Sequence, residues 1–122
     1  MAMTLEHKSL DRADERRDFP SGHIEVCTIG SAVFGRAVFE KGWRWSESVG
    51  PIAGTDNCMI NHNGYIESGH LHVRMDDGTE ADMGPGEFFV CPPGHDAWVV
   101  GDEDCVAFDF SADIAGYATP AT

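Results

Sequence analysis

The chain is poor in positive charge, and this scarcity narrows the range of its partners. Its 122 residues include eight lysines and arginines against 21 aspartates and glutamates, which gives a formal net charge of −13. Residues 1–20 hold five acids and four bases, so 16 acids and four bases remain for the rest of the chain. Because nucleic-acid affinity comes mainly from cationic side chains, the sequence predicts no nucleic-acid partner. The acidity instead favours a soluble surface that resists self-association.

Long apolar runs and paired cysteine motifs are also missing. No stretch approaches the roughly 18 apolar residues of a membrane span, and the N-terminal segment is too charged for a signal peptide. The four cysteines, Cys27, Cys58, Cys91 and Cys105, occur without a CxxC or a finger-like spacing. A reducing cytosol would keep such cysteines as thiols. These absences predict a cytoplasmic protein with no membrane partner.

Short apolar runs separated by turn residues make up most of what is present. The chain has 14 glycines and six prolines, and it is long enough to bury one core. Strands are expected at residues 23–29, 32–40, 43–47, 57–62, 65–68, 71–75, 88–91, 97–100 and 105–110. This spacing predicts an all-β fold, an antiparallel β-barrel or double-stranded jelly roll. We expect a flexible N-terminal tail over residues 1–18, the barrel domain over 19–117 and a C-terminal tail over 118–122.

Two motifs identify a family resemblance. Residues 62–69 read His-Asn-Gly-Tyr-Ile-Glu-Ser-Gly, and 16 residues later the segment 86–98 contains G-x5-P-x-G followed by His95. Together these segments resemble the two sequence motifs of a cupin. With the segments 42–47, 51–56 and 75–80, the chain is similar to small single-domain bacterial cupins, a group without a settled activity. The resemblance covers about residues 15–110 and implies a cupin-type antiparallel barrel.

The resemblance also implies where ligands of a metal would stand. Metal-dependent cupins use a His-x-His pair, a glutamate and a second-motif histidine. Counted from Gly42, the first glycine of the first motif, the two positions of the His-x-His pair hold Ser48 and Gly50. The position of the second-motif histidine holds Ala97. His62 stands at the glutamate position, and His95 lies two residues before the position of Ala97. The residues that normally hold a cupin metal are therefore mostly replaced.

His62 and His95 nevertheless predict a functional site. Cys58 and His62 have the same strand parity, so they would share one face, and the proline-glycine corner would hold His95 at the barrel mouth. These three donors, with Glu47 as a candidate fourth ligand, suit zinc or another borderline divalent transition metal. The alternative is a pair of neutral, hydrogen-bonded histidines in a ligand pocket, with Asp96 orienting one of them.

Further polar and aromatic residues belong to this prediction. Tyr65 and Trp98 are expected to line the cavity, and Arg44 could pair with a ligand carboxylate. His70 and His72 alternate with apolar residues, a pattern that favours a solvent-facing row over a metal pair.

Two tryptophans suggest an assembly state. Trp43 and Trp45 share strand parity, and burial against the barrel mouth or a partner subunit would explain such a pair. We therefore expect a homodimer.

Two functional classes fit these residues. One is a ligand-binding or regulatory module that holds a small organic molecule. The other is a metal-dependent enzyme, with Zn, Mn, Fe or Ni, that acts on a small organic substrate. The fold alone does not choose between them.

Overall fold

Short strands are the main regular elements of the computed structural model, which describes residues 4–120. The strands are β1 (Glu15–Phe19), β2 (Gly22–Ile29), β3 (Ala32–Phe39), β4 (His62–Ser68), β5 (His70–Met75), β6 (Glu80–Met83), β7 (Phe88–Cys91), β8 (His95–Val100) and β9 (Cys105–Asp109). The helices are all short: η1 (Leu10–Arg12), α1 (Trp45–Ser48), α2 (Gly50–Ala53) and η2 (Ala112–Gly116). Over the described residues, no helix has the length and apolar character to cross a membrane.

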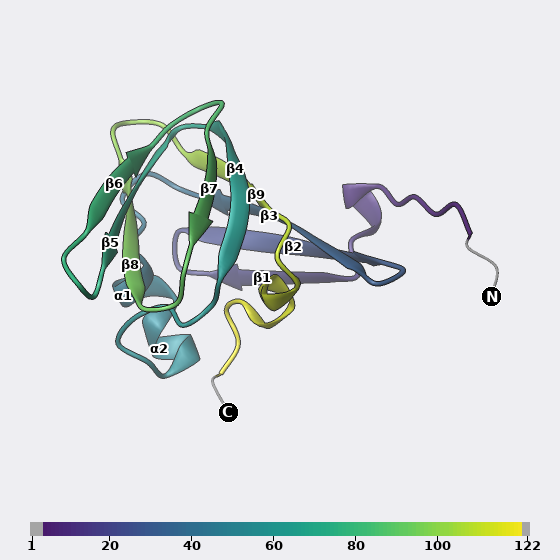
Figure 1. Ribbon diagram of the computed structural model, residues 1–122, viewed down its shortest axis with the longest axis horizontal. Helices are drawn as coiled ribbons and strands as arrows, with labels where there is room; N and C mark the ends of the chain where they lie inside the picture. The colour runs from purple at the N-terminus through teal and green to yellow at the C-terminus, as the bar shows by residue number, and fades with distance from the viewer. Residues whose placement is uncertain (1–3, 121–122) are drawn as a thin grey trace.

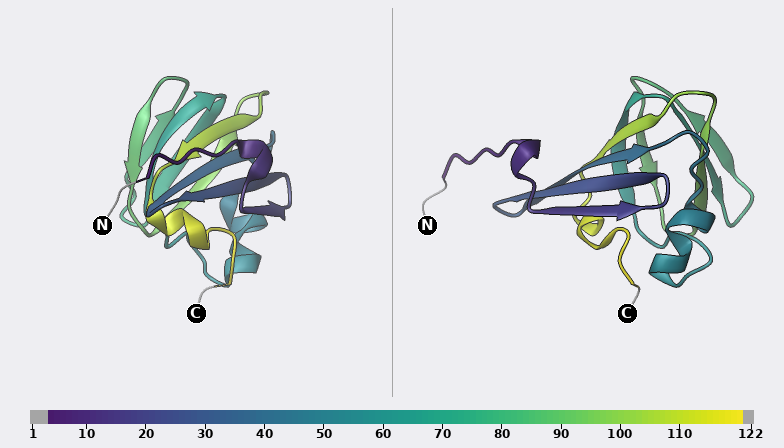
Figure 2. Two further views of the ribbon diagram at one scale, coloured as in Figure 1. Left: turned by 90° about the vertical axis from the view of Figure 1, so that its right-hand side faces the viewer. Right: turned by 180° about the vertical axis from the view of Figure 1, so that it is seen from behind.

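The strands lie in two antiparallel sheets. One sheet has the order β1-β2-β3-β9-β4-β7 and the other the order β6-β5-β8. Figure 1 shows β5, β6 and β8 on one side of the body, with α1 and α2 below them. In Figure 2, β1 and β2 extend away from the body as a long ribbon. The predicted all-β jelly roll is confirmed, although the two sheets do not close into one continuous barrel.

The core lies between the two sheets because alternate side chains of each strand point inward. In β8, His95, Ala97 and Val99 are buried, and their neighbours on β5, Leu71 and Val73, are buried as well. Each aliphatic side chain of this size stabilises the fold by roughly 1.5–3 kcal/mol when it is fully buried. The same alternation that fills the core therefore also turns His95 inward.

Glycines set two of the sharp turns. Gly69, with φ 75°, separates β4 from β5, and Gly86, with φ 87°, precedes β7. The sequence predicts that both glycines lie where strands end or begin, and the structure confirms it. The alternation of Leu71, Val73 and Met75 before the Asp-Gly turn also predicts a hairpin over residues 75–80. This hairpin is confirmed, because β5 pairs with β6 across a turn that contains Gly78.

Two of the expected strands are wrong. Residues 45–47 of the expected strand 43–47 lie in α1, because the carboxylate of Asp96 accepts hydrogen bonds from the Ser46 amide and hydroxyl in the first turn, at 2.9 and 2.8 Å. A carboxylate at this place satisfies amides that a helix start leaves free. In the expected strand 57–62, Cys58 makes only an isolated bridge to His95, and β4 begins at His62.

The expected tail boundary at residue 18 falls inside β1, which pairs with β2 along its length. The helical segment η1 lies just before it. Residues 1–3 and 121–122 of the two predicted tails lie outside the described residues.

Trp43 and Trp45 are buried inside their own chain, each with 2% exposure. Trp43 stacks on Phe39 with ring centroids 4.0 Å apart. The two indoles therefore give no reason for a partner subunit, and the homodimer stays a prediction. The most exposed large hydrophobic residues of the sheets are instead Phe88 and Val90 on the edge strand β7.

Candidate metal and ligand site

Three potential metal ligands converge at one end of the core. The ligand atoms of Cys58, His62 and His95 all lie within 4.8 Å of one another. His62 begins β4 and His95 begins β8. Cys58 is fixed beside His95 by two backbone hydrogen bonds, from the Cys58 amide to the His95 carbonyl (2.7 Å) and from the His95 amide to the Cys58 carbonyl (3.2 Å). The cluster is thus held by backbone pairing as well as by side-chain packing.

Both imidazoles are oriented through Nδ1. His62 Nδ1 lies 2.6 Å from Asp109 Oδ2, and His95 Nδ1 lies 2.7 Å from the Pro92 carbonyl oxygen. A carboxylate and a carbonyl accept hydrogen bonds, so Nδ1 of each ring carries the proton and donates it. In a neutral ring Nε2 then keeps its lone pair, which is the usual arrangement of a metal-binding histidine.

Asp109 is itself well anchored at the end of β9. It is 7% exposed, and its Oδ1 accepts hydrogen bonds from the amides of Ser111 (2.9 Å) and Asn63 (3.3 Å). Its other oxygen is therefore directed at His62. Asp109 therefore orients a histidine of the site, a role predicted for Asp96, and Asp96 instead accepts hydrogen bonds from Ser46.

Burial keeps two of the three donors, His95 and Cys58, uncharged at neutral pH. Loss of solvent, together with the neighbouring His62, lowers the pKa of His95 to about 4. Burial also raises the pKa of the Cys58 thiol to about 12. His95 therefore offers a free lone pair at neutral pH, whereas Cys58 becomes a strong ligand only when a metal displaces its proton.

A small cavity of about 50 Å³ adjoins the two histidines. Apolar side chains from both sheets line it, together with His62, His95, Trp43, Trp45 and Tyr117. The Tyr117 ring meets the His62 ring edge-on, with centroids 5.7 Å apart. The prediction that both histidines face the same cavity is confirmed, because their ring centroids are 5.2 Å apart and both line it.

The other residues predicted for the site lie elsewhere. Glu47 is exposed on α1 and is not part of the cluster. Tyr65 has the opposite parity to His62 in β4 and packs against Phe88, with centroids 4.8 Å apart. Neither residue lines the cavity.

Arg44 and Trp98 lie together on the outer face of the three-stranded sheet, where the guanidinium carbon lies 4.2 Å from the indole centroid. Trp98 alternates with the inward residues of β8, so it points away from His95. On the same outer face, the His72 ring stacks on the Trp98 ring. The two ring nitrogens of His72 face the carboxylates of Asp82 and Glu80.

Asp109 and Tyr117 were not predicted from the sequence. Asp109 shares strand parity with the inward residues Cys105 and Ala107, and this is the one signal that could have placed it inside. Tyr117 follows η2, and no periodicity in the sequence indicates its position.

Comparison with known proteins places the fold but not the activity. No protein-family model matches the chain, and no curated protein matches it. Among solved structures, the polyketide cyclase RemF from Streptomyces resistomycificus is 14% identical with a TM-score of 0.60, over 87% of this chain and 78% of RemF. A protein of unknown function from Rhizobium leguminosarum is 16% identical with a TM-score of 0.58, over 88% of this chain and 97% of that chain.

A Bacillus subtilis oxalate decarboxylase, OxdC, gives a TM-score of 0.61 at 13% identity. The match covers 90% of this chain but only 30% of OxdC. These likenesses show a cupin-type fold, so the resemblance seen in the sequence is confirmed at the level of the fold.

Proposed function

We propose that this protein is a metal-binding cupin in which Cys58, His62 and His95 hold one divalent transition metal ion. A small organic molecule binds at the position that these three ligands leave open. The observation that carries the proposal is the convergence of the three donors within 4.8 Å, with both imidazoles already oriented through Nδ1.

The spacing of the donors supports zinc. A tetrahedral zinc ion with Zn–N of about 2.1 Å and Zn–S of about 2.3 Å places those two ligand atoms about 3.6 Å apart. His62 Nε2 and Cys58 Sγ are 3.5 Å apart. Nitrogen and thiolate ligands together favour zinc and similar borderline metals over magnesium or calcium. Three protein ligands also leave the fourth position for a water or ligand, as in catalytic zinc sites.

An enzyme acting on a small organic substrate is the second candidate. The same open position supports it, since a metal there would polarise a bound oxygen. Two of the structural neighbours are enzymes, a polyketide cyclase and an oxalate decarboxylase. Ligand binding is common to both candidates and is the part that the geometry supports directly.

Cobalt titration tests the proposal. Co²⁺ added to metal-free protein should bind with one equivalent and should give a thiolate-to-cobalt charge-transfer band, because Cys58 is the sulfur ligand. Cys58→Ala should lose that band. Cys27→Ala is the matched control, because Cys27 is also buried (4% exposed) and lies outside the cluster. A charge-transfer band that persists in Cys58→Ala would reject this ligand set.

A further inference from the structure

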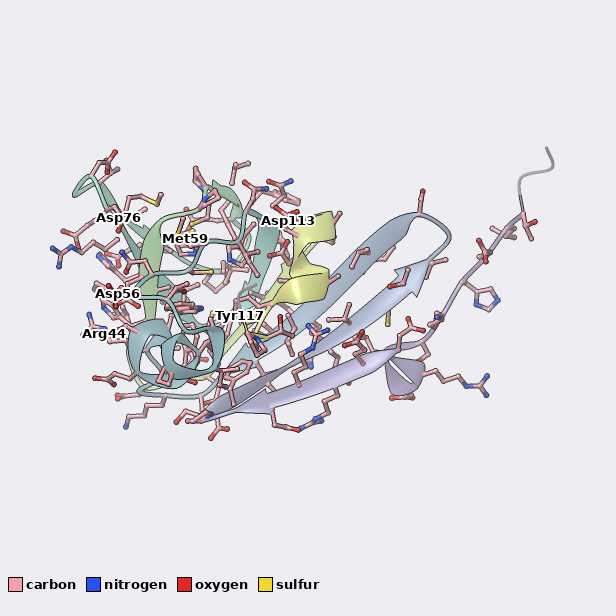
Figure 3. All side chains as sticks on the ribbon, turned by 90° about the horizontal axis from the view of Figure 1, so that it is seen from below. Arg44, Asp56, Met59, Asp76, Asp113 and Tyr117 are labelled. Carbon is pink, nitrogen blue, oxygen red and sulfur yellow. The ribbon has the colours of Figure 1, made fainter. Side chains whose placement is uncertain are left out.

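A second and larger hollow lies directly outside the candidate metal site. This groove, of about 490 Å³, lies between α2, the segment 55–60 and the end of the chain from η2 to Pro120. Figure 3 labels Met59, Asp113 and Tyr117 around it, between the short helices and η2. Trp45 and Tyr117 line both the groove and the inner cavity, and Cys58 lines the groove. These three side chains therefore lie between the groove and the inner end of the core, where the candidate metal site is.

The two hollows differ in what they could hold. The inner cavity, at about 50 Å³, has room for a few atoms, since one water needs about 10–15 Å³ on this measure. The groove, at about 490 Å³, lies in the range of roughly 300–1,000 Å³ that is typical of small-molecule sites. A ligand with more than a few heavy atoms must therefore place most of them in the groove.

The groove favours an uncharged, partly apolar ligand. Val49, Ala53, Met59 and Ile60 contribute much of its lining, and Met59 is 59% exposed. An exposed methionine is an adaptable contact for hydrocarbon groups. Within residues 4–120, the one ionisable side chain of the lining apart from Cys58 and Tyr117 is Asp113, an exposed acid in a chain with a net charge of −13. This charge disfavours an anionic ligand.

A buried donor at the inner end of the groove lacks an acceptor. Trp45 is 2% exposed, and within residues 4–120 its Nε1 has no hydrogen-bond partner. Buried indole N–H groups normally find a partner. Because Trp45 borders both hollows, an acceptor oxygen of a molecule bound there could supply that partner.

We propose that the groove binds the body of the ligand, an uncharged organic molecule with a carbonyl oxygen at one end and a hydrocarbon chain of a few carbons. The carbonyl end lies at the inner end of the groove, beside Trp45 and Cys58, and the hydrocarbon chain lies along Ala53 and Met59. The contact of the carbonyl end with a metal rests on the proposed function, whereas the groove contacts do not.

Two simple amides test this proposal. Acetamide and hexanamide share the carbonyl head and differ by four methylene groups, each of which strengthens binding about fourfold when fully buried. NMR titration of zinc-loaded and metal-free protein should show hexanamide binding at least about tenfold more tightly than acetamide. The indole N–H resonance of Trp45, assigned with Trp45→Phe, should shift with both amides.

A groove-filling variant locates the binding. Ala53→Phe should remove the advantage of hexanamide and leave zinc stoichiometry unchanged, because Ala53 lines the groove and lies outside the ligand cluster. Val90→Phe is the control, since Val90 is 72% exposed on β7. Equal binding of the two amides, or an advantage that survives Ala53→Phe, would overturn the groove proposal even if zinc binds. If zinc does not bind but the metal-free protein still binds hexanamide more tightly than acetamide, the proposed metal function is wrong and the groove proposal is supported.

Discussion

Asp109→Asn changes one atom of the group that orients His62. Oδ1 of Asp109 accepts hydrogen bonds from two backbone amides, and Oδ2 faces His62 Nδ1 at 2.6 Å. The asparagine oxygen should keep the Oδ1 place, because only an oxygen can accept there. Its NH₂ group then faces His62, which must turn Nδ1 into an acceptor. The proton moves to Nε2, and the lone pair that would bind the metal is lost.

The expected cost is large for metal binding and small for folding. When a metal-binding histidine loses the hydrogen-bond partner of its other ring nitrogen, the metal affinity typically falls about 10- to 100-fold, or roughly 1.4–2.7 kcal/mol. We expect the upper end of that range, because the substitution favours the wrong tautomer as well as removing a charge. Stability of the metal-free protein should fall by about 1 kcal/mol, since a neutral hydrogen bond replaces a charged one.

Competition with a chelating dye measures the zinc affinity, and urea unfolding of the metal-free protein measures its stability. Asp113→Asn is the matched control: it removes the same charge from an exposed residue of η2. A zinc dissociation constant of Asp109→Asn within twofold of the parent, or a loss equal to that of Asp113→Asn, would refute the role of Asp109.

Two predictions concern stability alone. The hydrogen bond to Asp82 is the main cause that raises the pKa of His72 above its usual value. The protonated His72 therefore contributes to the free energy of unfolding in full below about pH 6.5, and this stabilisation is lost as pH rises through the raised pKa. Urea unfolding across this pH range should show a smaller decline in His72→Gln, and an unchanged decline would contradict the prediction. Gly69→Ala should destabilise the fold by more than about 2 kcal/mol, because φ is 75° and a Cβ would meet the Asp104 carbonyl. Gly54→Ala, with φ 78° and open space around it, should cost only about 1 kcal/mol, and equal losses in thermal unfolding would count against this reasoning.

Local patterns predicted the fold and the two histidines. The cupin resemblance put His62 at a position whose side chain points inward, and the proline-glycine corner put His95 at the barrel mouth. Both signals come from short motifs, so they can be read from one sequence. The alternation from Cys58 to His62 was a weaker guide, because the expected strand 57–62 is not formed. The glycine at position 69 likewise marks a turn whose backbone conformation glycine adopts readily.

Contacts between distant segments could not be predicted in this way. Asp109 meets His62 across 47 residues, and Asp96 caps α1 across 50 residues. The second contact makes a helix of a segment whose alternation predicts a strand. The pairing of Arg44 with Trp98 on the outer face could not be predicted for the same reason. Arg44 directly precedes α1, and the position of α1 depends on its contact with Asp96.

Metal analysis of the purified protein is the most direct test of a metal site formed by Cys58, His62 and His95. The protein should be produced without an affinity tag or chelator and examined by elemental analysis beside His62→Ala and His70→Ala. About one zinc or similar ion per chain is expected in the parent and in His70→Ala, and none in His62→Ala. Absence of a stoichiometric metal after zinc reconstitution, or full retention of the metal in His62→Ala, would contradict the proposed metal site.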